Sequence, residues 1–160
     1  MAAKHSQAGV AAVLLSVPAA ASAVEQTTAS GGRTALHLAA SEGCTELVEL
    51  LLGRGATPRA RATQDWTPLH FAAREGHTEV CRLLVRRGAK VRAFYWLPVK
   101  SLRWQVNTRT AGGWTALMLA ASFNRQQSGQ LLLSAGAVVS SLQCGDEVGE
   151  TRKKPFLNIL

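Results

Sequence analysis

Gly32-Arg-Thr-Ala-Leu-His-Leu-Ala-Ala-Ser-Glu-Gly43-Cys-Thr-Glu-Leu-Val-Glu-Leu-Leu-Leu-Gly-Arg-Gly-Ala56 returns 33 residues later as Asp65-Trp-Thr-Pro-Leu-His-Phe-Ala-Ala-Arg-Glu-Gly76-His-Thr-Glu-Val-Cys-Arg-Leu-Leu-Val-Arg-Arg-Gly-Ala89. A third, looser copy begins at Trp114 and closes at Ala137. An internal period of this size predicts a stacked repeat protein, in which no single unit can bury its own apolar face. The sequence therefore predicts a binding surface rather than a catalytic pocket.

The copies resemble ankyrin repeats. In the second copy, Thr67-Pro68-Leu69-His70-Phe71-Ala72-Ala73 is followed by Gly76, Leu83-Leu84 and Gly88-Ala89, which is similar to an ankyrin repeat along almost its whole length. The resemblance implies an all-α fold, an ankyrin-type solenoid of helix-turn-helix repeats with projecting hairpin or loop fingers. The residues that carry the motif are Thr34, Leu36, His37 and Gly43 in the first copy, Thr67, Pro68, Leu69, His70 and Gly76 in the second, and Thr115 and Leu117 in the third.

The spacing of the copies predicts the domain organisation. Thr67 and Thr115 are 48 residues apart instead of 33, so 15 extra residues precede the third copy. We expect a repeat domain at 31–139, with repeats at about 32–64, 65–93 and 109–139 and an insertion at 94–108. Residues 140–160 break the pattern, and we expect a mostly disordered tail there, with Phe156–Leu160 as a short docking element.

The N-terminal 30 residues allow two interpretations. Residues 1–23 have a positive start, an apolar run and a small-residue end, as in a cleaved secretory signal. The same residues align at a spacing of 33 with the first copy, as a degenerate N-terminal cap repeat would. The cap is favoured because Lys4 is the only charge in the start zone, and it predicts a cytoplasmic or nuclear protein. A cleaved signal would predict a secreted one. No stretch is long and apolar enough to span a bilayer.

Each copy starts with residues that favour a helix. Thr67 can cap a helix through its hydroxyl, and Pro68 then fills the first helical position, where a missing N–H costs nothing. Gly43 and Gly76 suit the left-handed backbone of a tight helix exit, and Asn124 takes this place in the third copy. This pattern predicts one inner helix in each repeat.

A second, outer helix is predicted after each exit. Its apolar residues have the i, i+3, i+4 spacing of one buried stripe. The third copy should have the weakest outer helix, as either a degenerate C-terminal cap or part of a truncated array, because it has Met118 in place of histidine and Ser128-Gly129 in place of an apolar pair. The expected stripe holds Leu47, Leu50, Leu51, Val80, Leu83 and Leu84, and the expected helix ends are Gly55, Gly88 and Gly136.

The charge of the chain is concentrated in its middle. The formal net charge is +8, and residues 51–140 hold 13 lysines and arginines against Asp65, Glu75 and Glu79. A basic segment attracts acidic partners. We expect an acidic protein surface rather than nucleic acid, because the chain has no zinc finger or basic zipper.

The sequence has no pattern typical of a catalytic, metal or cofactor site. Cys44, Cys81 and Cys144 share no metal-ligand spacing, and Cys81 stands where a buried apolar residue is expected. The family resemblance implies that His37 and His70 brace neighbouring turns. Gly112-Gly113 is a turn, because no P-loop lysine follows it. We therefore expect no enzyme, no cofactor and no metal.

The resemblance implies a monomeric, non-enzymatic protein-binding module, a scaffold or adaptor that uses a concave groove and basic fingers. The rival interpretation is an exported or membrane-associated effector that uses its basic face on anionic surfaces. The aromatic residues of the 94–108 insertion fit partner contact, internal packing or no function. The candidate partner-binding residues are Arg33, Ser41, Glu42, Arg61, Thr63, Gln64, Trp66, Arg74, Glu75, Trp96, Trp104, Arg109, Trp114, Ser122 and Phe123.

Overall fold

The fold is taken from a computed structural model that describes residues 23–29, 31–90 and 106–139. Three predictions fall on other residues. The cap or leader predicted over residues 1–30 lies outside the described residues except for 23–29, and the tail at 140–160 and most of the 94–108 insertion lie outside them as well. Trp96, Trp104 and Cys144 belong to these segments.

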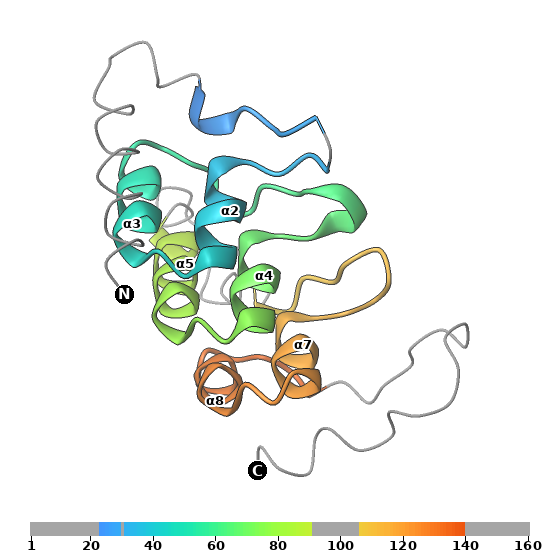
Figure 1. The fold of residues 1–160 in the computed structure, drawn as a ribbon. Helices are drawn as coiled ribbons and strands as arrows, with labels where there is room; N and C mark the ends of the chain where they lie inside the picture. Colours follow the sequence, from blue (N-terminus) through green and yellow to red (C-terminus); the bar gives the residue numbers. More distant parts are fainter. Residues whose placement is uncertain (1–22, 30, 91–105, 140–160) are drawn as a thin grey trace.

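The described residues form a stack of helix pairs (Figure 1). The inner helices are α2 (Ala35–Glu42), α4 (Pro68–Glu75) and α7 (Ala116–Ser122). The outer helices are α3 (Thr45–Gly53), α5 (Thr78–Lys90) and α8 (Gln126–Ser134). Each inner helix packs on the next inner helix, and each outer helix packs on the next outer one. Two short 3-10 helices, η2 (Ala23–Glu25) and η3 (Thr63–Asp65), complete the described part of the chain, in which no strand occurs.

The inner helices begin and end at the predicted residues. Thr67 is the extended N-cap of α4, and Pro68 is its first helical residue. Thr115 caps α7 by accepting the backbone N–H of Met118 at 3.2 Å. Gly76 follows α4 with a left-handed φ of 87°, and Asn124 follows α7 in the same conformation with a φ of 55°.

The buried stripe of the outer helices agrees in part with the predicted one. Leu51 is fully buried in α3, and Val80 and Leu84 are 1% and 3% exposed in α5, as predicted. Leu47 and Leu83 are partly buried and pack against the core, whereas the prediction of a core position for Leu50 is wrong. The buried side of each outer helix is rotated slightly from the predicted one, so Val48 and Cys81 also join the core, and the outer-helix residues of the core are Val48, Leu51, Val80, Cys81, Leu84 and Leu132.

The prediction that Gly88 ends the second outer helix is also wrong. The helix α5 continues through Gly88 to Lys90, whereas Gly55 and Gly136 have left-handed φ values of 90° and 89° beyond the ends of α3 and α8. The first and third outer helices must turn at their glycine. Because 15 extra residues precede the third copy, the chain does not have to turn at Gly88.

Gly43 is required for two reasons, and we expect Gly43→Ala to destabilise the fold. Its φ is 74°, and a Cβ atom would lie 2.5 Å from Nδ1 of His77, whose Nε2 donates to the carbonyl of Ser41 at 3.0 Å. The left-handed backbone alone costs alanine roughly 1–2 kcal/mol, and displacing His77 adds the loss of a hydrogen bond, about 1 kcal/mol. Urea denaturation measures the loss.

The matched control is Gly53→Ala. Gly53 is the last residue of α3, and nothing lies within 4 Å of an added Cβ. This variant should be neutral or stabilised by up to about 1 kcal/mol, since alanine favours the helix. Equal urea midpoints for the two variants would contradict the assignment of His77 to the space above Gly43.

Candidate functional site

His37 joins the first inner helix to the finger that follows, where "finger" denotes the segments 54–66 and 107–114 between helix pairs. Its Nδ1 accepts the backbone N–H of Thr34 at 3.1 Å, which leaves the proton on Nε2. Nε2 lies 3.0 Å from the carbonyl oxygen of Ala60 and 3.1 Å from that of Trp66, to which it donates. Burial lowers the pKa of His37, so the ring stays neutral and holds the finger in place.

His70 does the same one repeat later. Its Nδ1 accepts the backbone N–H of Thr67 at 3.2 Å, and its Nε2 donates to the carbonyl of Thr108 at 3.0 Å. Burial lowers the pKa of His70 to about 4. Met118 occupies the same position in α7 and is 5% exposed, so the third repeat has no imidazole to hold a further finger.

The fingers lie side by side. The first is closed by a bond of 2.8 Å from the N–H of Ala62 to the carbonyl of Trp66, and the second by a bond of 2.9 Å from Thr110 to Trp114. They are joined because the N–H of Ala111 donates to the carbonyl of Gln64 at 2.8 Å. The fingers therefore form one continuous edge along the inner helices (Figure 1).

Arg61, a predicted partner-binding cation of the first finger, is already paired. Its guanidinium lies 2.9 Å from the carboxylate of Asp65, and both side chains are about half exposed. Such surface pairs contribute little to stability, and this one reduces the free charge of the finger. Arg109 in the second finger is exposed.

The side of the inner helices that faces away from the outer helices forms a surface we call the inner face. On α2, Leu36, Ala39 and Ala40 face the core, which leaves Leu38 as an exposed apolar residue. Leu38 is 42% exposed, and Phe123, the C-cap of α7, is 45% exposed. By equivalent position in the three repeats, the inner face follows Leu38, Ser41, Glu42, Phe71, Arg74, Glu75, Leu119, Ser122 and Phe123, of which Phe71 and Leu119 are each only 4% exposed.

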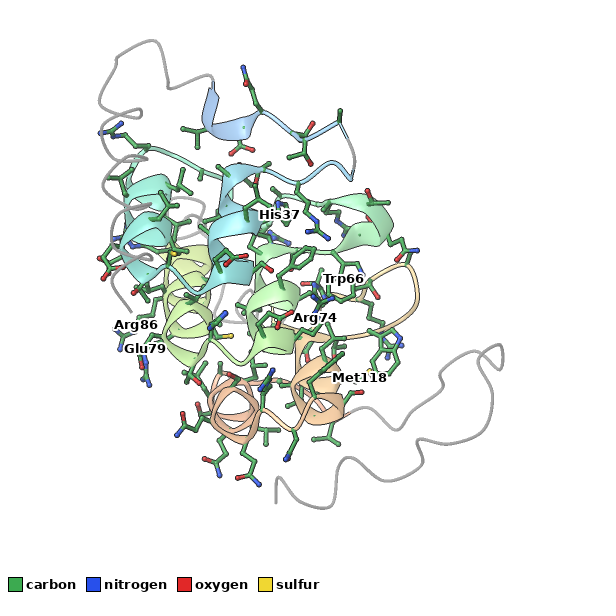
Figure 2. All side chains as sticks on the ribbon, in the orientation of Figure 1. His37, Trp66, Arg74, Glu79, Arg86 and Met118 are labelled. Atoms are coloured by element: carbon green, nitrogen blue, oxygen red, sulfur yellow. The ribbon has the colours of Figure 1, made fainter. Side chains whose placement is uncertain are left out.

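An aromatic and cationic stack lies where the inner helices meet the first finger, since Arg33 and Trp66 directly precede the N-caps of α2 and α4. The rings of Trp66 and Phe71 have centroids 5.0 Å apart. The guanidinium of Arg33 lies 4.7 Å from the centroid of Phe71, and that of Arg74 lies 5.5 Å from that of Trp66. Figure 2 shows Trp66 and Arg74 next to one another beside α4. Both distances are within the range of a cation–π interaction.

The structure thus brings four of the predicted residues together, namely Arg33, Trp66, Arg74 and Glu75. Phe71, whose ring contacts both Arg33 and Trp66, was not among the predicted partner-binding residues. The sequence feature that could have identified Phe71 is that the other two copies have leucine at this position. The remaining predicted residues lie apart from this stack: Ser41, Glu42, Ser122 and Phe123 elsewhere on the inner face, Thr63 and Gln64 in η3, Trp114 at the end of the second finger, and Trp96 and Trp104 outside the described residues.

The described cysteines and carboxylates offer little chemistry. Cys44 and Cys81 are free thiols, and burial raises the pKa of Cys81 to about 12, which makes it a poor nucleophile. Among residues 23–29, 31–90 and 106–139, no group of three or more His, Cys, Asp and Glu side chains could hold a metal ion. No helix in these ranges is long and apolar enough to cross a membrane.

Comparison with known proteins agrees with the geometry. A family model described as ankyrin repeats (3 copies) matches the chain over two overlapping segments, residues 1–95 and 63–143. A search of curated proteins gave no significant match.

Proposed function

Because the chain belongs to the ankyrin repeat family, whose members are generally protein–protein interaction modules and typically not enzymes, we propose that it is a scaffold or adaptor that binds a protein partner along the inner face and the fingers. The observation that carries this proposal is the stack of Arg33, Phe71, Trp66 and Arg74, which lies where the inner face meets the first finger. Binding hot spots are enriched in tryptophan and arginine.

The exposed apolar residues support the same surface. Leu38 in α2 and Phe123, the C-cap of α7, are large and solvent-exposed, and they belong to the first and the third repeat. Scattered single apolar residues on a surface need no explanation, but these lie on the same face as the half-buried Trp66. We propose that a partner which follows the inner face covers all three residues. We also propose that the protein acts as a monomer, in the cytoplasm or nucleus.

Trp66→Ala tests this proposal. Trp66 is half-buried, and its indole packs on Phe71, so we expect a stability loss of about 1 kcal/mol from the lost aromatic pair. We expect the affinity for the partner to fall at least about tenfold, the effect of losing a central tryptophan. Proximity labelling in the native cell identifies a partner, and isothermal titration calorimetry with that recombinant partner measures the affinity.

Arg86→Ala is the matched control. Arg86 is exposed on the outer helix α5, away from the inner face (Figure 2). The affinity of Arg86→Ala for the partner should stay within about twofold of the parent value, because most residues outside a hot spot contribute little to binding. If Trp66→Ala binds like the parent, or if Arg86→Ala weakens binding as much, the partner does not use the inner face.

A further inference from the structure

The two cations of the aromatic and cationic stack, Arg33 and Arg74, differ in whether they have an acidic partner. The Nη2 atom of Arg74 lies 2.6 Å from the Glu75 carboxylate, and its Nε donates to the same oxygen at 2.8 Å. Arg33 is exposed and has no ion pair with any residue in the described part of the chain. Of the two arginines in the aromatic and cationic stack, Arg33 is therefore the one whose guanidinium is available to a ligand.

Arg33 is held in place before any ligand arrives. Its guanidinium lies on the ring of Phe71, which belongs to the next repeat. Its backbone is fixed on both sides by Thr28, whose hydroxyl accepts the Arg33 N–H at 3.2 Å and whose N–H donates to the Arg33 carbonyl at 2.9 Å. A stacked guanidinium keeps its edge N–H groups free for a bidentate carboxylate. It also loses less entropy on binding than a mobile side chain would.

The single free charge of Arg33 favours a carboxylate over a phosphate. Arg74, the other cation of the stack, is already paired with Glu75. A phosphate group carries up to about two negative charges, which one unpaired guanidinium does not balance. One carboxylate matches one free guanidinium.

We propose that Arg33 binds the carboxylate of an aspartate or glutamate in a partner segment, and that apolar residues flanking this acid contact Leu38 and Trp66. This proposal rests on the proposed function, and it specifies the partner as an acidic and apolar peptide segment. Leu38 is one turn of α2 beyond the N-cap Thr34, which directly follows Arg33, and is 42% exposed. The site therefore offers a cation with apolar surface beside it.

The test begins with a random peptide library displayed on phage and selected on the immobilised full-length chain. The most enriched peptide is then synthesised with a fluorophore, together with a version in which its acidic residues are replaced by their amides. Fluorescence anisotropy gives the Kd of both peptides for the parent, Arg33→Ala, Arg33→Lys and Arg74→Ala. Since Arg33 is exposed and its side chain is held by the contact with Phe71, its variants should stay folded and melt only slightly below the parent temperature, which circular dichroism verifies.

We expect the library to enrich aspartate or glutamate beside apolar residues. Arg33→Ala should weaken the enriched peptide about tenfold, and Arg33→Lys should weaken it less, because lysine keeps the charge but not the planar fork. Arg74→Ala should have a smaller effect than Arg33→Ala. The amide peptide should bind the parent about tenfold more weakly and bind Arg33→Ala no more weakly than the acidic peptide does.

Phe71→Leu provides a second, independent variant. Leucine occurs at the same position in the other two repeats, as Leu38 and Leu119, so the substitution suits the fold. It removes the ring that contacts Arg33, and with it the ring contacts to Trp66 and His37, but it removes no charge. We expect a several-fold loss of affinity and a smaller further loss on adding Arg33→Ala than in the parent background.

Two results would overturn the proposal. Enriched peptides without acidic residues, or peptides that bind Arg33→Ala as tightly as the parent, would show that Arg33 is not the carboxylate site, while Trp66→Ala could still weaken them as the proposed function requires. If the library enriches no peptide, and if Trp66→Ala binds the natural partner as tightly as the parent does, the proposed function is contradicted as well.

Discussion

Leu84→Ala is expected to lower the free energy of unfolding by roughly 2–5 kcal/mol, the range for deleting a buried leucine side chain. Leu84 is 3% exposed and belongs to the core cluster that joins the helix layers. Its removal leaves a cavity between α5 and its neighbours, which cannot collapse because the repeats on both sides hold the helix in place. Equilibrium urea denaturation measures the loss.

Leu83→Ala is the control, since the two leucines are adjacent and chemically identical. Leu83 is only partly buried and lies at the edge of the core cluster, so its loss should be clearly smaller. If Leu83→Ala lowers the free energy of unfolding as much as Leu84→Ala does, α5 does not turn Leu84 rather than Leu83 into the core.

The stability of the fold should fall as the pH is lowered from about 6.5 to about 4, because of His70. Burial keeps this imidazole neutral in the folded chain, with a pKa of about 4, and the nearby Arg61 acts in the same direction. The unfolded chain binds a proton near pH 6.5, so below that pH protonation favours unfolding. The contribution of His70 is complete above pH 6.5, falls with the pH, and has lost about 3 kcal/mol near pH 4.

His70→Met isolates this contribution. The third repeat already has methionine at this position, as Met118, so the side chain suits the fold. The variant should be less stable than the parent at pH 7, because Thr108 loses its donor, yet its stability should fall less steeply between pH 6.5 and 5. The two proteins share every other side chain, so the difference between their curves isolates His70. Parallel stability curves for the two proteins would show that His70 does not titrate as described.

Most of the fold follows from local sequence signals. Thr67 and Pro68 begin a helix because the threonine hydroxyl can cap the helix and the proline fills the first position, where a missing N–H costs nothing. Gly43 ends a helix because glycine adopts a left-handed φ without strain. These properties belong to a few adjacent residues, so the sequence is enough to predict them. The end of α5 depends instead on the path of the chain after the helix, which the residues around Gly88 do not determine. The prediction that α5 ends at Gly88 was wrong for this reason.

The central stack of the candidate site was only partly predictable. Trp66 and Arg74 belong to one repeat, and their positions before and within the inner helix suggested a shared surface. The contact of Arg33 with Phe71 crosses two repeats, and it depends on how far one inner helix is rotated and shifted against the next. The pairing of Arg61 with Asp65, four residues apart, leaves Arg61 less free than its sequence position suggested.

The claim that a partner binds on the inner face is tested most directly by hydrogen–deuterium exchange of the full-length chain with and without the library-selected peptide. The account predicts slower exchange on peptide binding in the first turns of α2 and α4 and in the finger at 54–66, with no change in α3, α5 and α8. Protection confined to the outer helices would contradict it.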